Sequence, residues 1–181
     1  KLKAYGAVNV HEEAYDFGKA WTRGVSRARL LNANGQEIHV AQMAWSPATE
    51  GVLKGEVGLL EAKTLEELKA LLPALDGKIV VMGRIPSPGK DVKDRMAFYG
   101  ELMGTMRQAK FKATLMESDK KDDLMNMTGS PAGRMRGGSV PTAFISKEHS
   151  ELLKRLVARG QKPEVELELG GKYSDAPVKA Y

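Results

Sequence analysis

The residues that could carry chemistry are few in this 181-residue chain, and they are scattered. There is no cysteine, and the three histidines are His11, His39 and His149. His11 stands beside Glu12 and Glu13, but zinc needs three or four ligands that converge tetrahedrally, which adjacent residues at a strand end rarely do. His39 falls in a predicted strand with no nearby partner, and His149 falls in the first turn of a predicted helix. We therefore predict no catalytic residue and no metal ligand in this chain.

Two features of a glycine-containing segment could still act on a ligand. The stretch Gly129–Gly133 reads GSPAG, which loosely resembles the outline GxSxG although its serine, Ser130, stands one position early. A nucleophile elbow needs a strand before the serine and a helix after it, whereas Pro131 places Ser130 in a loop, so a chance match is favoured. Arg134 and Arg136 follow in the same loop and could hold a carboxylate by charge-assisted hydrogen bonds, although a solvated basic loop is the simpler interpretation. These two arginines are the candidate substrate-binding residues.

Composition excludes several classes of function. The formal net charge is +5, but the densest charged run, 117–123, mixes both signs, and basic residues do not alternate with aromatic ones along any stretch. We therefore expect no nucleic-acid partner. No apolar run approaches the roughly 18 residues of a membrane span, so we predict none. The chain opens with Lys1 rather than Met, and a signal peptide could lie upstream of it.

The first half of the chain is typical of short strands, predicted over 7–10, 28–31, 38–43 and 52–60 with a turn at 32–35. Thr64 and Glu67 then form a capping box that starts a helix ending near Pro73. Further strands are predicted over 78–83, 113–116, 140–145 and 164–169.

Two more helices separate these strands. In the helix predicted over 94–108, Met96, Tyr99, Met103 and Met106 share one face, which we expect to pack on a sheet rather than to bind peptides. A third helix begins after Ser146 and ends at Gly160. The prediction is an α+β fold, a β core of mixed sheets flanked by about three helices, in a single domain over residues 1–181. Residues 1–20 are a lead-in to it and residues 170–181 a polar linker.

Several short segments of the sequence resemble motifs of a known family. The strand 78–83 after Asp76-Gly77 resembles the "GKIVLV" strand of protease-associated domains, and the segment 139–146 before the third helix resembles their "PxxxIS" segment. More narrowly, the chain is similar to the protease-associated domain inserted in M28-type zinc peptidases of the glutamate carboxypeptidase and carboxypeptidase Q kind. Four further stretches carry that resemblance: 21–24, 45–49, 124–129 and 165–169.

This resemblance implies a function for the segment. It implies a non-catalytic domain that covers the active-site cleft of an extracytoplasmic peptidase, shaping access of peptide substrates. The paired zinc ions would be held by His, Asp and Glu residues of a catalytic domain beyond this chain, and that domain would be its partner. The alternatives are a free-standing module that binds peptides or proteins at a sheet edge and, third, an enzyme in its own right. Many members of the family carry cysteines in the loop after the "GKIVLV" strand, whereas this chain has Ile-Pro-Ser-Pro-Gly at 85–89.

Overall fold

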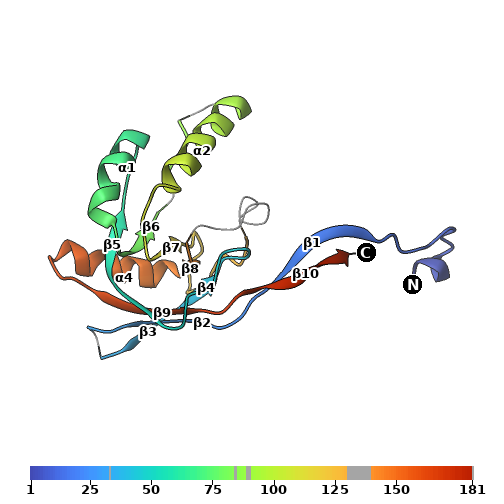
Figure 1. Ribbon diagram of the computed structural model, residues 1–181, viewed down its shortest axis with the longest axis horizontal. Helices are drawn as coiled ribbons and strands as arrows, with labels where there is room; N and C mark the ends of the chain where they lie inside the picture. Colours follow the sequence, from blue (N-terminus) through green and yellow to red (C-terminus); the bar gives the residue numbers. More distant parts are fainter. Residues whose placement is uncertain (33, 84, 89–90, 130–139, 181) are drawn as a thin grey trace.

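The main body of the protein is one eight-stranded mixed sheet with helices packed on it, which confirms the predicted α+β class (Figure 1). The computed structural model describes residues 1–32, 34–83, 85–88, 91–129 and 140–180. The strands of this sheet are β2 (Ser26–Leu30), β3 (Gln36–Ile38), β4 (Val40–Gln42), β5 (Leu53–Leu60), β6 (Ile79–Met82), β7 (Ala113–Glu117), β8 (Thr142–Ile145) and β9 (Glu164–Leu169). The helices are α1 (Leu65–Leu71), α2 (Val92–Met106) and α4 (Lys147–Ala158), with short 3-10 turns η1 (Leu2–Tyr5) and η2 (Leu72–Leu75).

The order of strands shows how the sheet curves. The order is β3-β2-β9-β5-β6-β7-β8-β4, in which β5 to β8 run parallel and the other pairs run antiparallel. The helices α1 and α2 are the crossovers that parallel neighbours require. Strands β3 and β4 lie at opposite ends of the order, yet only His39 separates them in sequence. The two edges must therefore approach each other, and the Gln42 amide of β4 donates to Ser26 Oγ of β2 at 3.0 Å.

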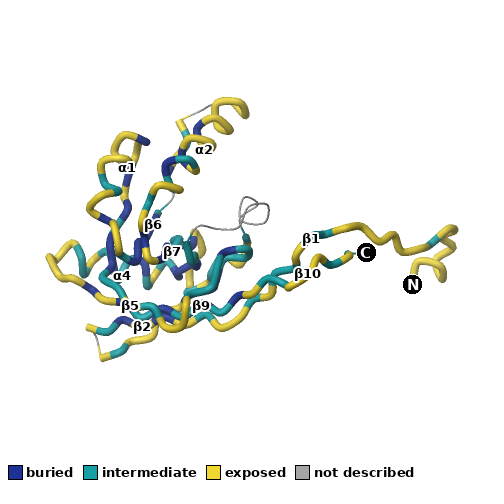
Figure 2. Tube along the Cα trace, in the orientation of Figure 1, coloured by how far each residue is buried: buried dark blue, intermediate teal, exposed yellow. Residues whose placement is uncertain are grey.

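Both faces of the parallel strands are covered. Along β6, Ile79 and Val81 point into an inner cluster, whereas Val80 and Met82 point into an outer one. This is why β6 is buried at every position and its sequence is a continuous apolar run. Helix α4 contributes Leu153 to the inner cluster, and the outer cluster lies under α1 and α2. Figure 2 shows the buried residues gathered along the sheet and the helix faces that meet it.

Local signals set the ends of α1 and α4 as predicted, whereas α2 begins at Val92, after its cap Asp91, and ends at Met106 instead of spanning 94–108. Thr64 Oγ1 accepts the Glu67 amide at 3.1 Å at the start of α1. The Glu67 carboxylate reaches back one residue further than the capping box predicts and accepts the Lys63 amide at 2.7 Å. Ser146 caps α4, and Gly160, with a φ of 74°, ends it in the left-handed region that glycine adopts without steric cost.

The prediction that the methionine face of α2 packs on the sheet is wrong for Met96, Tyr99 and Met103, which are exposed, whereas Met106 does pack against the outer cluster. Phe98, Leu102 and Thr105 are buried, whereas the exposed fractions of Met96 and Met103 are 67% and 40%. Residues 98, 102 and 105 form a second stripe at helical spacing, offset from the methionines. Phe98 and Leu102 of this stripe belong to the outer cluster.

The two ends of the chain form a separate two-stranded antiparallel ribbon of β1 (Tyr15–Thr22) and β10 (Lys172–Ala180), which extends away from the sheet (Figure 1). Its register pairs Tyr15 with Ala180 and Thr22 with Lys172. The polar linker predicted over 170–181 is thus largely strand, and the lead-in predicted over 1–20 is strand only from Tyr15 onward. The strand predicted over 7–10 is absent, because those residues precede the ribbon and have no strand to pair with there; Val8 is 89% exposed.

The base of the ribbon is fixed to the sheet by hydrogen bonds. The Trp21 indole N–H donates to the Ser46 carbonyl at 3.3 Å, and the Tyr173 hydroxyl donates to the Trp45 carbonyl at 2.7 Å. The fully buried Gln42 accepts the Gly171 amide at 2.6 Å. The turn-rich loop after β4 therefore holds both strands of the ribbon.

Candidate functional site

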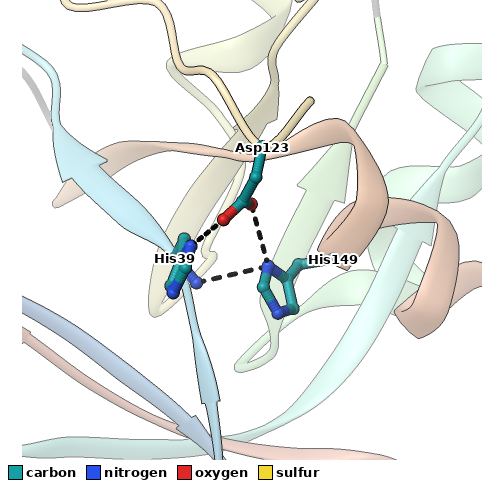
Figure 3. Close-up of side chains that lie close together, drawn as sticks. All are labelled: His39, Asp123 and His149. Carbon is teal, nitrogen blue, oxygen red and sulfur yellow. Dashed lines mark hydrogen bonds and ion pairs between the residues drawn. The ribbon is translucent and has the colours of Figure 1, made fainter. Parts of the chain in front are cut away.

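Two histidines and an aspartate, far apart in sequence, meet at one point of the surface (Figure 3). His39 Nδ1 contacts Asp123 Oδ2, and His149 Nδ1 lies 3.5 Å from Asp123 Oδ1. One potential ligand atom from each residue lies within 4.8 Å of the others. The expectation that His39 has no nearby partner is wrong, because a partner 84 residues away leaves no trace in local spacing. We call these three residues the His–Asp–His cluster.

The loop after β7 places Asp123. Asp122 and Asp123 have φ values of 59° and 57°, in the left-handed region, which is uncommon outside glycine although aspartate tolerates it. The Glu148 carboxylate accepts both backbone amides, at 3.1 and 3.2 Å. A side chain of α4 thus holds the loop in the conformation that turns Asp123 toward the histidines.

The start of α4 places His149 against His39, the single residue between β3 and β4. Ser146 accepts the His149 amide as the helix cap, and its Oγ also lies 2.8 Å from His149 Nδ1. The His39 carbonyl accepts the Ser146 amide at 3.2 Å, and the His39 amide donates to His149 Nδ1 at 3.4 Å. The two imidazole rings lie 5.0 Å apart between centroids. Both backbone groups of His39 are therefore hydrogen-bonded to residues at the start of α4, and these bonds fix its position between β3 and β4.

The cluster is partly open to solvent and carries one ionised carboxylate. The His39 side chain is 47% exposed, whereas that of His149 is 16% exposed. The Ser146 hydroxyl beside it and the His39 ring lower the pKa of Asp123, against the opposing effect of desolvation. Asp123 is therefore a carboxylate at neutral pH. Its Oδ1 is buried and, within the part of the chain that the structure describes, has no hydrogen-bond donor.

The cluster lies where two parallel strands end. Asp123 follows β7, His149 follows β8, and the Ser118 amide joins the ends of both strands by donating to the Ile145 carbonyl at 3.0 Å. In open α/β sheets ligands bind outside the carboxyl ends of parallel strands, and β7 and β8 form a parallel pair although the sheet as a whole curves until its edges approach. The cluster occupies that position.

The other candidate residues from the sequence do not join the cluster. Arg134 and Arg136, and Ser130 of the GSPAG stretch, lie outside the described residues. His11 is exposed and bonds Glu13 at 2.8 Å, near the N-terminus. No short-range spacing could have found the cluster, because its three members are separated by 84 and 26 residues.

Comparison with known proteins gives relatives among peptidases. No family model matches the chain. Carboxypeptidase Q from Bos taurus is 28% identical over 181 residues, covering 97% of this chain and 36% of that protein. This similarity relates the chain to the M28 peptidases that the sequence motifs suggested.

Solved structures share the fold. A peptidase M28 precursor from Shewanella amazonensis SB2B superimposes with a TM-score of 0.70 at 22% identity, covering 99% of this chain and 41% of that one. An aminopeptidase from Aneurinibacillus sp. strain AM-1 gives 0.61 at 17% identity, with coverage of 99% and 38%. The chain therefore spans less than half the length of each relative. None of its described helices is both long and apolar enough to cross a membrane.

Proposed function

We propose that this chain is a protease-associated domain of a zinc-dependent M28-type exopeptidase, in which it covers the active-site cleft without contributing catalytic groups. The observation that carries the proposal is the similarity to carboxypeptidase Q over 97% of this chain but only 36% of that protein. A segment related to part of a peptidase, and folding around its own core, fits an accessory domain. On this proposal the zinc ions belong to a catalytic domain beyond the segment, which is its partner, and the protein is extracytoplasmic.

The ribbon supports this proposal. An inserted domain leaves and rejoins its host at neighbouring points, and chain ends that lie close together make insertion tolerable. Strands β1 and β10 bring residues 15 and 180 into register. The paired ends provide a two-stranded connection between this sheet and a host domain.

Substrate contact is the finer part of the proposal. A peptide with a free carboxyl end needs a cationic partner, and Arg134 and Arg136 offer two guanidinium groups two residues apart in the sequence. We propose that they bind the terminal carboxylate of the substrate. The alternative, a free-standing binding module, has one observation in its favour, which is the exposed apolar face of α2 at Met96, Tyr99 and Met103.

Two variants of the intact peptidase test the proposal. In the first, residues 23–171 are replaced by an Asn-Gly turn, which fits because Thr22 and Lys172 are partners in the ribbon. Hydrolysis of a small amide substrate should persist while selectivity among longer peptides changes. A folded variant that has lost all hydrolysis would show that the segment is catalytic.

The second variant, Arg134→Ala with Arg136→Ala, should raise KM for peptides with a free carboxyl end about tenfold or more, with little change in kcat. Arg107→Ala, an exposed arginine at the end of α2, is the matched control. Unchanged kinetics in the double variant would remove the carboxylate contact from the proposal.

A further inference from the structure

The geometry of the His–Asp–His cluster points to a site for one divalent transition-metal ion, and we propose that it binds Zn²⁺ through the two imidazoles and the Asp123 carboxylate. The inference concerns residues of this chain alone and does not rest on the proposed function. It replaces our sequence-based expectation that the chain holds no metal ligand.

The composition of the cluster suits zinc. Imidazole nitrogens and a carboxylate oxygen are common zinc ligands, whereas Mg²⁺ and Ca²⁺ prefer sites made of oxygens. Two atoms bound to one tetrahedral zinc at about 2.0–2.1 Å lie about 3.4 Å apart. His149 Nδ1 and Asp123 Oδ1 lie 3.5 Å apart, which matches that separation.

Within the described part of the chain, one carboxylate oxygen of the cluster has no hydrogen-bond donor and lies beside a ring nitrogen. His149 Nδ1 lies 3.4 Å from the His39 amide and 2.8 Å from Ser146 Oγ. Asp123 Oδ1, which faces it, is buried and has no donor among the described residues. A buried carboxylate oxygen without a donor is costly, because its lost hydration is not replaced. A cation beside Asp123 Oδ1 would supply the missing partner, and His149 Nδ1 is near enough to be a second ligand.

The surroundings hold Asp123 and His149 in place before any ion arrives, whereas His39 Nδ1 must exchange its contact with Asp123 Oδ2 for the ion. Glu148 fixes Asp122 and Asp123 in left-handed backbone conformations, and Ser146 joins the His39 carbonyl to the start of α4. Strained backbone held by its neighbours is common where a ligand binds. The exposed side of His39 gives access from solvent, so a water molecule can complete a site with three protein ligands.

Zinc titration of the chain tests the site. The chain is stripped with a chelator, and Zn²⁺ alone is then titrated in a calorimeter, with Mg²⁺ as the comparison ion. We expect one Zn²⁺ per chain and no binding of Mg²⁺ at the same concentration. His39→Ala, His149→Ala and Asp123→Asn should each weaken Zn²⁺ binding by about 100-fold or more, since loss of even an outer partner of a ligand costs 10- to 100-fold.

The controls separate the site from incidental binding. His11→Ala removes the remaining histidine, which also has a nearby carboxylate, and should leave the affinity unchanged. Asp123→Asn keeps the size of the side chain and its tolerance of the left-handed region, so it should fold even if His149→Ala does not; circular dichroism checks this. X-ray absorption at the zinc edge should show two imidazole ligands.

Two results would overturn the proposal. One is a wild-type chain that binds no Zn²⁺, which would make the cluster a hydrogen-bonded clamp between the sheet edges and α4. The other is a Zn²⁺ affinity that survives in both His39→Ala and Asp123→Asn, or that falls with His11→Ala instead.

Discussion

At the scale of single residues, Glu117 shows how a charged group is accommodated near the core. It ends β7 and accepts from Lys154 Nζ at 2.5 Å and Ser150 Oγ at 2.7 Å, both on α4. Burial by itself would raise the pKa of the Glu117 carboxyl, but these two donors outweigh it, so the pKa lies below its ordinary value. These two hydrogen bonds connect β7 of the sheet to α4, the helix that carries His149.

The sign of this shift gives a pH prediction. Because the folded pKa of Glu117 is lowered, its contribution to the free energy of unfolding is complete above about pH 4.5 and is lost as the pH falls through the lower, folded value. Glu117→Gln should therefore destabilise the chain by about 1.5–3 kcal/mol at pH 7, the range for a charged hydrogen bond, and by less near pH 3. Urea unfolding at several pH values measures both.

The matched control is Glu151→Gln. Glu151 bonds the same lysine at 3.2 Å but is 43% exposed, so solvent screens it more and the change should cost less than 1 kcal/mol. Equal losses for the two variants at pH 7 would contradict the argument from burial.

At the scale of elements, helix α2 carries two apolar stripes, of which only one packs. Phe98 and Leu102 join the outer cluster under the helix, whereas Met96, Tyr99 and Met103 face outward. A helical period predicts which residues share a face but not which of two faces meets the sheet. The choice depends on Ile85, Phe111 and the other residues that the sheet presents to it.

Substitutions on the two faces of α2 should differ in their effect on the free energy of unfolding. Leu102→Ala should cost about 2–5 kcal/mol, because it removes buried methyl groups and leaves a cavity. Met103→Gln, one position along, should change the free energy of unfolding by less than about 0.5 kcal/mol, as exposed substitutions usually do. Chemical denaturation measures both, and a large loss for Met103→Gln would show that the outward face is packed.

At the scale of the whole molecule, the sheet and the ribbon have separate sources of stability. The sheet and its helices bury two clusters of side chains, whereas β1 and β10 mainly contact each other and contain no buried residue (Figure 2). An isolated two-stranded ribbon is marginally stable in water. The stability of the ribbon therefore depends on the hydrogen bonds at its base, to Gln42 and to the Trp45 carbonyl.

Removing the ribbon tests this division. A chain limited to residues 23–171 keeps both clusters and the bond from Gly171 to Gln42. We expect it to unfold cooperatively, with a Tm lower by only a few degrees, since it loses the bonds of Trp21 and Tyr173. Calorimetry gives the Tm. Loss of the cooperative transition would mean that the ribbon is part of the folding unit.

Sequence was sufficient wherever the cause of a structure is local. Caps such as Thr64 and Ser146 act within four residues, and the apolar residues that alternate along the predicted strand 164–169, namely Val165, Leu167 and Leu169, are the buried residues of β9. The family motifs are also short phrases in a fixed order. The α+β class and the relation to M28 peptidases could therefore be inferred before the fold was known.

What remained depends on contacts between distant segments. The pairing of β1 with β10 and the buried stripe of α2 follow from partners elsewhere in the chain. The His–Asp–His cluster is the strongest case, because His39 approaches His149 only when β3 and β4 bring the two edges of the sheet together. Local sequence patterns depend on residues that are close along the chain. Residues 39, 123 and 149 become neighbours only through the fold of the sheet, so no periodic pattern predicts the cluster.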